Sequence, residues 1–215
     1  MITLHALKFS RATRVLWLLD DLGQPCKRID YDRTAEFGAL DAMSRVHPLG
    51  KSPVIEDDAE MIAESATILR YLVAKYGDAT HQPPRGTPDF WRHEAMFDYV
   101  EASFAEVAMQ AILPAFRGRA VPDQARAALD RHLSYITGQL DDGPLLFGTK
   151  PMLADIQISY ILALLDKLEL LGNHAEIAAY WQQLQNQPGY IAALDAAGPM
   201  APRGGPGFST SFLPQ

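Results

Sequence analysis

The most constraining feature of this chain is a β-hairpin that runs directly into a helix at Glu64 and Ser65. Residues 53–55 and 61–63 are short apolar runs on either side of an acidic break, the pattern of two strands joined by a tight turn. Apolar side chains at helical spacing follow over residues 66–76. A helix N-terminus attracts anions through its free N–H groups and its dipole, so this junction is a candidate carboxylate site. In the alternative interpretation, Ser65 is only the N-cap of an amphipathic helix.

The N-terminal residues predict another strand that leads into a helix. Residues 1–6 alternate weakly between apolar and polar side chains, as a strand does, and residues 11–22 carry apolar side chains at helical spacing. Gly23 ends that helix, and a further strand is predicted over residues 27–31. The resulting order is strand, helix, strand, connecting helix, two strands and helix. This is a thioredoxin-like layout, with Ser10 at its first strand-to-helix junction.

The rest of the chain has a helical pattern. Residues 78–88 are rich in proline and glycine and are predicted to form a linker. Helices are predicted beyond it over residues 89–116, 122–140, 153–171, 174–185 and 189–197. The fold prediction is therefore an α+β thioredoxin-like domain over residues 1–77, followed by an all-α helical bundle over residues 89–197. Residues 198–215 are too rich in glycine and proline for regular structure and are predicted to be an irregular tail.

Composition narrows the class of protein. The net charge of -7 gives no support for binding to nucleic acid or to an anionic membrane. No apolar run approaches the ~20 residues that a membrane-spanning helix needs. The single cysteine, Cys26, excludes an internal disulfide and indicates a reducing compartment, so we expect a cytoplasmic protein without a signal peptide. The six histidines show no metal-ligand spacing, and we expect no metal.

Short motifs in the first half of the chain resemble the N-terminal domain of the glutathione S-transferase superfamily. They are S-x-x-x-R-V-L-W-L-L-D over residues 10–20, P-x-G-K-x-P over residues 48–53, and the pair Glu64 and Ser65. The sequence L-A-D-I over residues 153–156 resembles the start of the buried helix in that family's C-terminal domain. The nearest pattern is the serine-type branch of bacteria and fungi.

The resemblance implies a cis peptide bond before Pro53. A cis proline turns the neighbouring N–H and C=O groups toward a cleft, where they pair with the cysteinyl backbone of a peptide ligand. Two residues depart from the family pattern. His47 stands where Asn often precedes Pro48, and Ser52 stands where Val usually precedes the cis proline. The implied role of Ser52 uses only the main chain, so this departure need not abolish it.

The resemblance also implies which residues bind glutathione as co-substrate. Glu64 and Ser65 would hold its γ-glutamyl end, and Lys51 would pair with its glycyl carboxylate. Lys51 is equally well a solvated turn lysine, and His47 either helps or only caps the turn. The implied glutathione-binding residues are His47, Lys51, Ser52, Pro53, Glu64 and Ser65.

Ser10 is the predicted catalytic residue. A serine at a helix start is more often a cap, and no His and Asp are spaced to make it a nucleophile, so hydrolysis is rejected. A hydrogen bond from its hydroxyl to a thiolate is worth about 1.5–3 kcal/mol, which lowers a thiol pKa by about 1–2 units. The resemblance implies that this thiol is glutathione's. Arg11 and Arg14 add positive potential nearby, and Arg14 is equally well a structural ion-pair partner.

Two further residues are interpreted as structural. Asp155 lies in an apolar helix, at the third position from which an acidic side chain reaches back to the N–H of the cap residue, here Met152. Cys26 is far from Ser10 in the sequence, and single cysteines are usually buried and inert. Thiol–disulfide exchange through a protein thiol is therefore not expected.

The resemblance thus implies a glutathione transferase, a detoxification enzyme whose second domain holds a small hydrophobic electrophile. The candidate residues for the electrophile pocket are Phe9, Tyr99, Phe104 and Phe116. Two alternatives remain open. One is a glutathione-dependent peroxidase or deglutathionylating enzyme on the same fold, and the other is a non-catalytic partner-binding protein, because fold does not fix function.

A homodimer is also expected. The resemblance implies a two-fold pair, and the predicted helices carry apolar residues on more than one face, which a monomer would partly expose. These residues are Met61, Ile62, Met96, Phe97 and Phe104. Phe208 and Phe212 indicate that the tail packs on the folded part of the protein.

Overall fold

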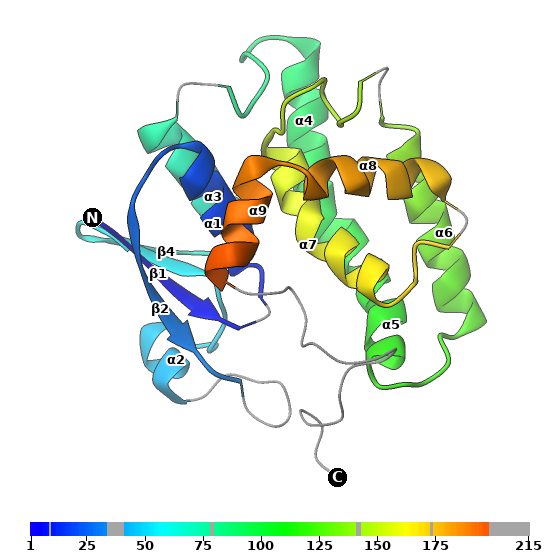
Figure 1. Ribbon diagram of the computed structural model, residues 1–215, viewed down its shortest axis with the longest axis horizontal. Helices are drawn as coiled ribbons and strands as arrows, with labels where there is room; N and C mark the ends of the chain where they lie inside the picture. Colours follow the sequence, from blue (N-terminus) through cyan, green and yellow to red (C-terminus); the bar gives the residue numbers. More distant parts are fainter. Residues whose placement is uncertain (9, 34–40, 78–79, 141–142, 173, 198–215) are drawn as a thin grey trace. The chain divides into compact units, whose positions relative to one another are not determined.

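The computed structural model of the chain falls into two compact units (Figure 1). The structure describes residues 1–8, 10–33, 41–77, 80–140, 143–172 and 174–197. The first unit comprises Met1–Gly77 together with one helix from the far end of the chain. The second unit comprises the described residues that lie between these two stretches.

The first unit is built on a four-stranded mixed sheet. Its strands are β1 (Ile2–Leu7), β2 (Cys26–Tyr31), β3 (Val54–Asp57) and β4 (Glu60–Ala63), in the order β2-β1-β3-β4. β1 pairs in parallel with β2, while β3 pairs antiparallel with both β1 and β4. This sheet confirms the predicted thioredoxin-like fold.

Helices connect these strands. α1 (Ala12–Asp21) joins β1 to β2, and Gly23 follows it with φ 61°, the left-handed conformation that ends many helices. The connecting helix that the layout requires is α2 (Asp41–Val46), which contributes Met43 to a buried cluster with Leu7 and Val54. α3 (Ser65–Tyr76) follows β4 directly and packs against α1. The strand-to-helix junctions at Ser10 and Ser65 thus lead into two helices that pack against each other.

The last described helix, α9 (Pro188–Ala197), belongs to the first unit and packs on α1. The ring of Tyr190 meets that of Trp17 edge to face, with 5.4 Å between ring centroids. The backbones approach closely at Gly189, where a Cβ atom would lie 2.5 Å from Trp17 Cδ1. The sequence predicts this helix as part of the helical domain over residues 89–197, whereas in the structure it belongs to the first unit. Its apolar side chains alone do not show which surface covers them.

The second unit is all-helical. Its helices are α4 (Pro88–Tyr99), the π-helical segment η1 (Val100–Phe104), α5 (Ala105–Phe116), α6 (Asp123–Thr137), α7 (Leu153–Lys167) and α8 (Ala175–Gln185). The predicted helix over residues 89–116 is therefore three consecutive segments. Thr87 caps the first of them by accepting a hydrogen bond from the Phe90 N–H. No helix of the described stretches is long and apolar enough to cross a membrane.

α7 is the buried helix of this unit, and Asp155 anchors its N-terminus as the sequence indicated. Asp155 Oδ2 accepts from the N–H of Met152 at 2.9 Å, and Oδ1 accepts from the N–H of Leu146 at 3.1 Å. The hydroxyl of Tyr180 donates to the same Oδ1 at 2.8 Å. Burial raises the pKa of this carboxyl to about 6, although these three bonds act in the opposite direction.

Candidate functional site

Ser10 lies in the short connection between β1 and α1 and is 6% exposed. Its Oγ accepts a hydrogen bond from the N–H of Ala12 at 3.2 Å, and its carbonyl accepts from Thr13 Oγ1 at 3.2 Å. Ser10 therefore does bond a backbone N–H at the helix start, as the capping alternative required. A capping role and a catalytic role for Ser10 are compatible, because a hydroxyl that accepts from an N–H still has its own hydrogen to donate.

The side chain of Ser52 reaches Ser10. The two Oγ atoms lie 3.3 Å apart. Ser52 Oγ also accepts from the N–H of Leu7 at 3.0 Å and donates to the carbonyl of His5 at 3.2 Å. The peptide bond between Ser52 and Pro53 is cis, as the resemblance implied. From the sequence, only the main chain of Ser52 was expected to have a role, and the structure adds its hydroxyl. The sequence signal for a role of the hydroxyl was the serine itself, at a position where the family pattern usually has valine.

Ser65 is the first residue of α3, and Arg14 of α1 donates to it. Arg14 Nη1 lies 3.0 Å from Ser65 Oγ, and both residues are buried. A guanidinium only donates, so Ser65 accepts this bond and keeps its own hydrogen for another acceptor. The N-cap position is Glu64, so the alternative in which Ser65 is the N-cap is wrong. The guanidinium adds a full positive charge to the partial charge at the N-terminus of α3.

Glu64 has an unusual backbone conformation. Its φ is 67° and its ψ is 117°, a combination that side chains other than glycine rarely adopt. Such a residue costs of order 1–3 kcal/mol and persists where the surroundings enforce it, often at a ligand site. The side chain of Glu64 is exposed and makes no capping bond to its own helix. Its carboxylate is accordingly accessible to a cation at the start of α3.

The turn before Ser52 holds the other two predicted glutathione residues. His47 Nδ1 accepts from the N–H of Leu49 at 3.4 Å, and the His47 carbonyl accepts from the N–H of Gly50 at 2.7 Å. These bonds favour the alternative in which His47 caps the turn. Lys51 is exposed, so its ammonium is accessible to an anionic ligand.

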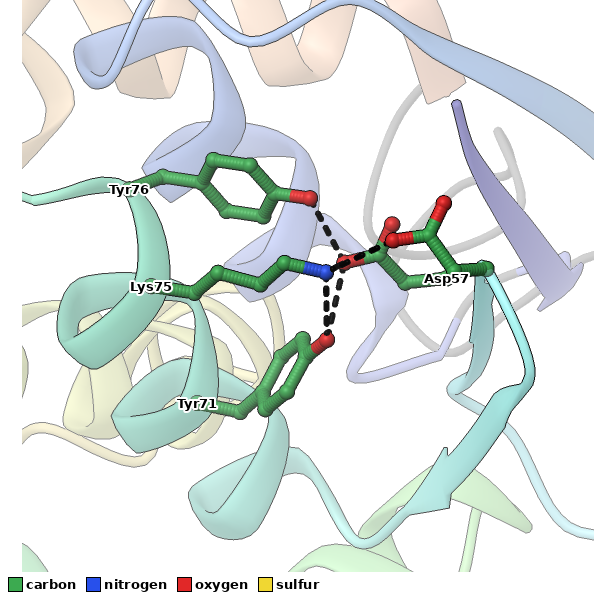
Figure 2. A network of polar contacts seen from close by, with 5 residues as sticks. Asp57, Tyr71, Lys75 and Tyr76 are labelled. Carbon is green, nitrogen blue, oxygen red and sulfur yellow. Dashed lines mark hydrogen bonds and ion pairs between the residues drawn. The ribbon is translucent and has the colours of Figure 1, made fainter.

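A buried carboxylate braces the far end of α3 (Figure 2). Asp57 Oδ2, at the end of β3, accepts from Tyr76 at 2.6 Å, Lys75 at 2.8 Å and Tyr71 at 2.9 Å. Burial by itself would raise the pKa of Asp57, but the bonds from Lys75, Tyr76 and Tyr71 outweigh it and lower the pKa to about 2. This network fixes the helix that carries Ser65. This network was not predicted from the sequence. Its signal was the presence of three hydrogen-bond donors, Tyr71, Lys75 and Tyr76, within six residues of one helix.

The four candidate residues for the electrophile pocket differ in their surroundings. Phe9 lies outside the described residues. Phe104 is fully buried in the second unit and is part of its core. Phe116, the last residue of α5, is half-buried. Tyr99 is half-buried at the end of α4, where its hydroxyl lies 2.7 Å from His132 Nδ1.

Tyr99 and His132 form a neutral pair beside the π-helical segment. Their rings stack with 5.7 Å between centroids. Burial raises the pKa of Tyr99 and lowers the pKa of His132, so both groups are uncharged at neutral pH. His132 was not predicted, because no pattern in the sequence links it to a residue 33 positions earlier.

Cys26 is half-buried at the start of β2. Burial raises the pKa of its thiol, which disfavours the reactive thiolate. This agrees with its interpretation as a structural residue. In the described part of the chain, no group of three or more His, Cys, Asp or Glu residues is placed to hold a metal ion.

The family and the proteins that this chain matches are all described as glutathione S-transferases. Residues 4–84 match the family described as "Glutathione S-transferase, N-terminal domain". Glutathione S-transferase 3 of Schizosaccharomyces pombe is 40% identical over 103 residues, which cover 48% of this chain and 42% of that protein. Glutathione S-transferase 1 of Saccharomyces cerevisiae is 39% identical over 87 residues, which cover 38% of this chain and 37% of that protein. The chain therefore matches about two fifths of the length of these curated relatives.

A solved structure extends the likeness to the second unit. The crystal structure of a glutathione S-transferase from Actinobacillus pleuropneumoniae superposes with a TM-score of 0.80 and 26% sequence identity. The superposition covers 93% of this chain and 94% of the other. Together with the match over residues 4–84, it shows that each of the two units is similar to the corresponding part of a glutathione S-transferase.

Proposed function

We propose that this protein is a serine-type glutathione transferase, which binds glutathione in its first unit and directs the thiolate to a small hydrophobic electrophile. The observation that carries the proposal is the hydroxyl of Ser10. It is buried between β1 and α1, in the same unit as the cis peptide before Pro53 and the α3 N-terminus. This arrangement offers one donor for a sulfur atom and separate groups for the two ends of a peptide.

Ser10 would act on the thiol pKa. Its Oγ accepts from the Ala12 N–H, and its hydrogen would be donated to a bound thiolate. A free thiol has a pKa of about 8.5, and a donated bond worth about 1.5–3 kcal/mol lowers it by about 1–2 units. The thiol proton passes to solvent. The thiolate then forms a carbon–sulfur bond with the electrophile. In a substitution the displaced electron pair departs with the leaving group, and in an addition the π pair moves to the far atom of the double bond, which takes a proton from solvent.

The ends of glutathione would be held at α3 and at the turn before the cis proline. The γ-glutamyl carboxylate would accept from the Ser65 hydroxyl and lie near the Arg14 guanidinium, which already contacts Ser65. Glu64 would accept from the γ-glutamyl ammonium. The main chain at Ser52 would pair with the cysteinyl residue, and the exposed Lys51 would pair with the glycyl carboxylate.

We also propose a cytoplasmic homodimer that acts in detoxification. The single cysteine is the feature that supports a reducing compartment. Three of the residues that suggested a dimer, Met96, Phe97 and Phe104, are buried within the second unit and lend the dimer no support. Met61 remains a candidate contact, because its side chain is 54% exposed in the first unit. Light scattering tests this proposal: a mass near that of one 23.7 kDa chain refutes the dimer.

Ser10→Ala is the decisive variant for the enzymatic proposal. Difference absorbance of the bound thiolate and the pH dependence of conjugation should both show a thiol pKa higher by about 1–2 units, with glutathione affinity within a few-fold of wild type. Ser134→Ala, which removes an exposed hydroxyl from α6, is the control. A wild-type protein that binds glutathione without lowering its thiol pKa would refute the proposal. A substrate panel with aryl halides, enals, peroxides and glutathionylated peptides then distinguishes transferase from peroxidase or deglutathionylating activity.

A further inference from the structure

Ser52 Oγ makes three polar contacts and has one hydrogen to donate. The N–H of Leu7 only donates, so it occupies one lone pair of Ser52 Oγ at 3.0 Å. The carbonyl of His5, at 3.2 Å, only accepts. Ser10 Oγ, at 3.3 Å, is able to do either. The hydrogen of Ser52 therefore has two acceptors within reach, the His5 carbonyl and Ser10 Oγ.

The two hydroxyl hydrogens can be arranged in two ways. In the first, Ser52 donates to the His5 carbonyl and Ser10 donates to Ser52, so the hydrogen of Ser10 is already in use. In the second, Ser52 gives up its bond to the His5 carbonyl and donates to Ser10, whose Oγ then accepts from both Ser52 and the Ala12 N–H. Only the second arrangement leaves the hydrogen of Ser10 free to point at a bound anion.

We propose that Ser52 is a positioning residue for Ser10: when a thiolate binds, the Ser52 hydroxyl turns from His5 to Ser10 and orients the Ser10 hydroxyl toward the sulfur. This inference rests on the proposed function, because it assigns a thiolate as the acceptor of the Ser10 hydrogen. A hydroxyl that accepts two bonds becomes a stronger donor through polarisation, and the effect is larger where water is excluded. Ser10 is 6% exposed, which meets that condition.

The backbone explains why the side chain of Ser52 is held in this place. In the antiparallel register of β1 and β3, His5 lies opposite Val54, and continuing that register places Leu7 opposite Ser52. The side chain of Ser52, rather than a main-chain carbonyl, accepts from the Leu7 N–H at this position. Its Oγ is thereby fixed from the strand side while it faces Ser10 on the other. Valine, the usual residue of the family here, has no atom that makes either bond.

The kinetic pKa of bound glutathione tests this role. Ser52→Val should raise that pKa by about 0.3–0.6 units, and thus lower kcat/KM about 2–4-fold at pH values below it. Ser52→Thr, which restores a hydroxyl, should recover the wild-type pKa. Ser52→Ala leaves room for a water at the Leu7 N–H and provides the same comparison if valine disturbs the strand.

A double-mutant cycle with Ser10→Ala separates positioning from a purely structural effect. If Ser52 acts through Ser10, then Ser52→Val should leave the pKa unchanged in the Ser10→Ala background. The same shift in both backgrounds, or no shift in either, would overturn the inference while the proposed function stands. A wild-type protein that binds glutathione without lowering its pKa would instead refute the proposed function, and the inference with it.

Discussion

The guanidinium of Arg14 donates to the hydroxyl of Ser65 at 3.0 Å, so a fully buried positive charge from α1 meets the first residue of α3. The S-x-x-x-R motif therefore places its serine and its arginine at two different junctions. Ser10 precedes α1, whereas the side chain of Arg14, one helical turn on, reaches the junction after β4. The two halves of the proposed glutathione site are thus tied to the same helix.

Removing the Ser65 hydroxyl should weaken the binding of glutathione through its γ-glutamyl carboxylate. We expect Ser65→Ala to cost about 1–2 kcal/mol of glutathione binding, or roughly 5–30-fold in affinity, because a charged acceptor loses one donor. Titration calorimetry measures this loss directly. Thr67→Ala, which removes an exposed hydroxyl from the same helix, should bind as the wild type does. Equal affinities for Ser65→Ala and wild type would count against the assignment.

The positive φ of Glu64 predicts opposite changes in stability and binding. Glycine adopts this backbone without strain, so Glu64→Gly should raise the free energy of unfolding by about 0.5–2 kcal/mol after the entropy cost of glycine is subtracted. It should also weaken glutathione binding, because it removes the carboxylate. Glu64→Ala is the matched variant, since it loses the carboxylate but keeps the strained conformation. Urea unfolding that shows both variants equally stable would mean that the backbone here is not strained.

The sequence predicted the elements of the fold because their signals are local. The helical spacing before Gly23 and the acidic turn after Ile55 each lie within one element, and the structure has α1 and the β3–β4 hairpin there. The π-helical segment after Tyr99 was missed, since a single extra residue in a turn barely changes the apolar spacing of a long helix.

Contacts between distant residues explain most of what was missed in the site. The bond from Arg14 to Ser65 spans 51 positions, and the contact of Ser10 with Ser52 spans 42. Periodicity indicates that a side chain is buried but not which partner it meets. The family resemblance identified Ser10 and Ser65 as candidates, but only the structure shows that the Ala12 N–H and Ser52 Oγ contact Ser10 and that Arg14 Nη1 contacts Ser65.

Asp57 should make the first unit sensitive to acid. Its folded-state pKa of about 2 lies below its ordinary value of 3.8, so its ionised form stabilises the fold above about pH 4 and this contribution is lost as the pH falls toward 2. Asp57→Asn should lower the free energy of unfolding by roughly 1–3 kcal/mol at pH 7 and flatten its decline between pH 4 and 2. Urea unfolding across this range is the measurement. Asp58→Asn, which alters the exposed partner of Lys75, should retain the wild-type slope.

Asp155 should show the opposite dependence on pH. Its folded-state pKa of about 6 lies above the ordinary 3.8, so its contribution to stability is complete below about pH 4 and is lost as the pH rises through 6. Tyr180→Phe removes one donor from the ionised carboxylate. The loss should be about 1–3 kcal/mol at pH 7 and smaller at pH 4, where the acceptor is neutral. Tyr135→Phe, on an exposed ring, is the control, and equal losses at both pH values would contradict the bond to an ionised Asp155.

The close approach at Gly189 should make the docking of α9 testable. A Cβ atom there would lie 2.2 Å from Asp21 Oδ1 and 2.5 Å from Trp17 Cδ1, well inside contact distance. Gly189→Ala should therefore lower the free energy of unfolding by about 1–3 kcal/mol, because α9 has to move away from α1. It should also change the fluorescence of Trp17, whose ring contacts Tyr190. Gly138→Ala, at the end of α6, has its nearest neighbour at 3.4 Å and should cost little. If Gly189→Ala leaves both stability and fluorescence unchanged, α9 does not pack on α1 through this residue.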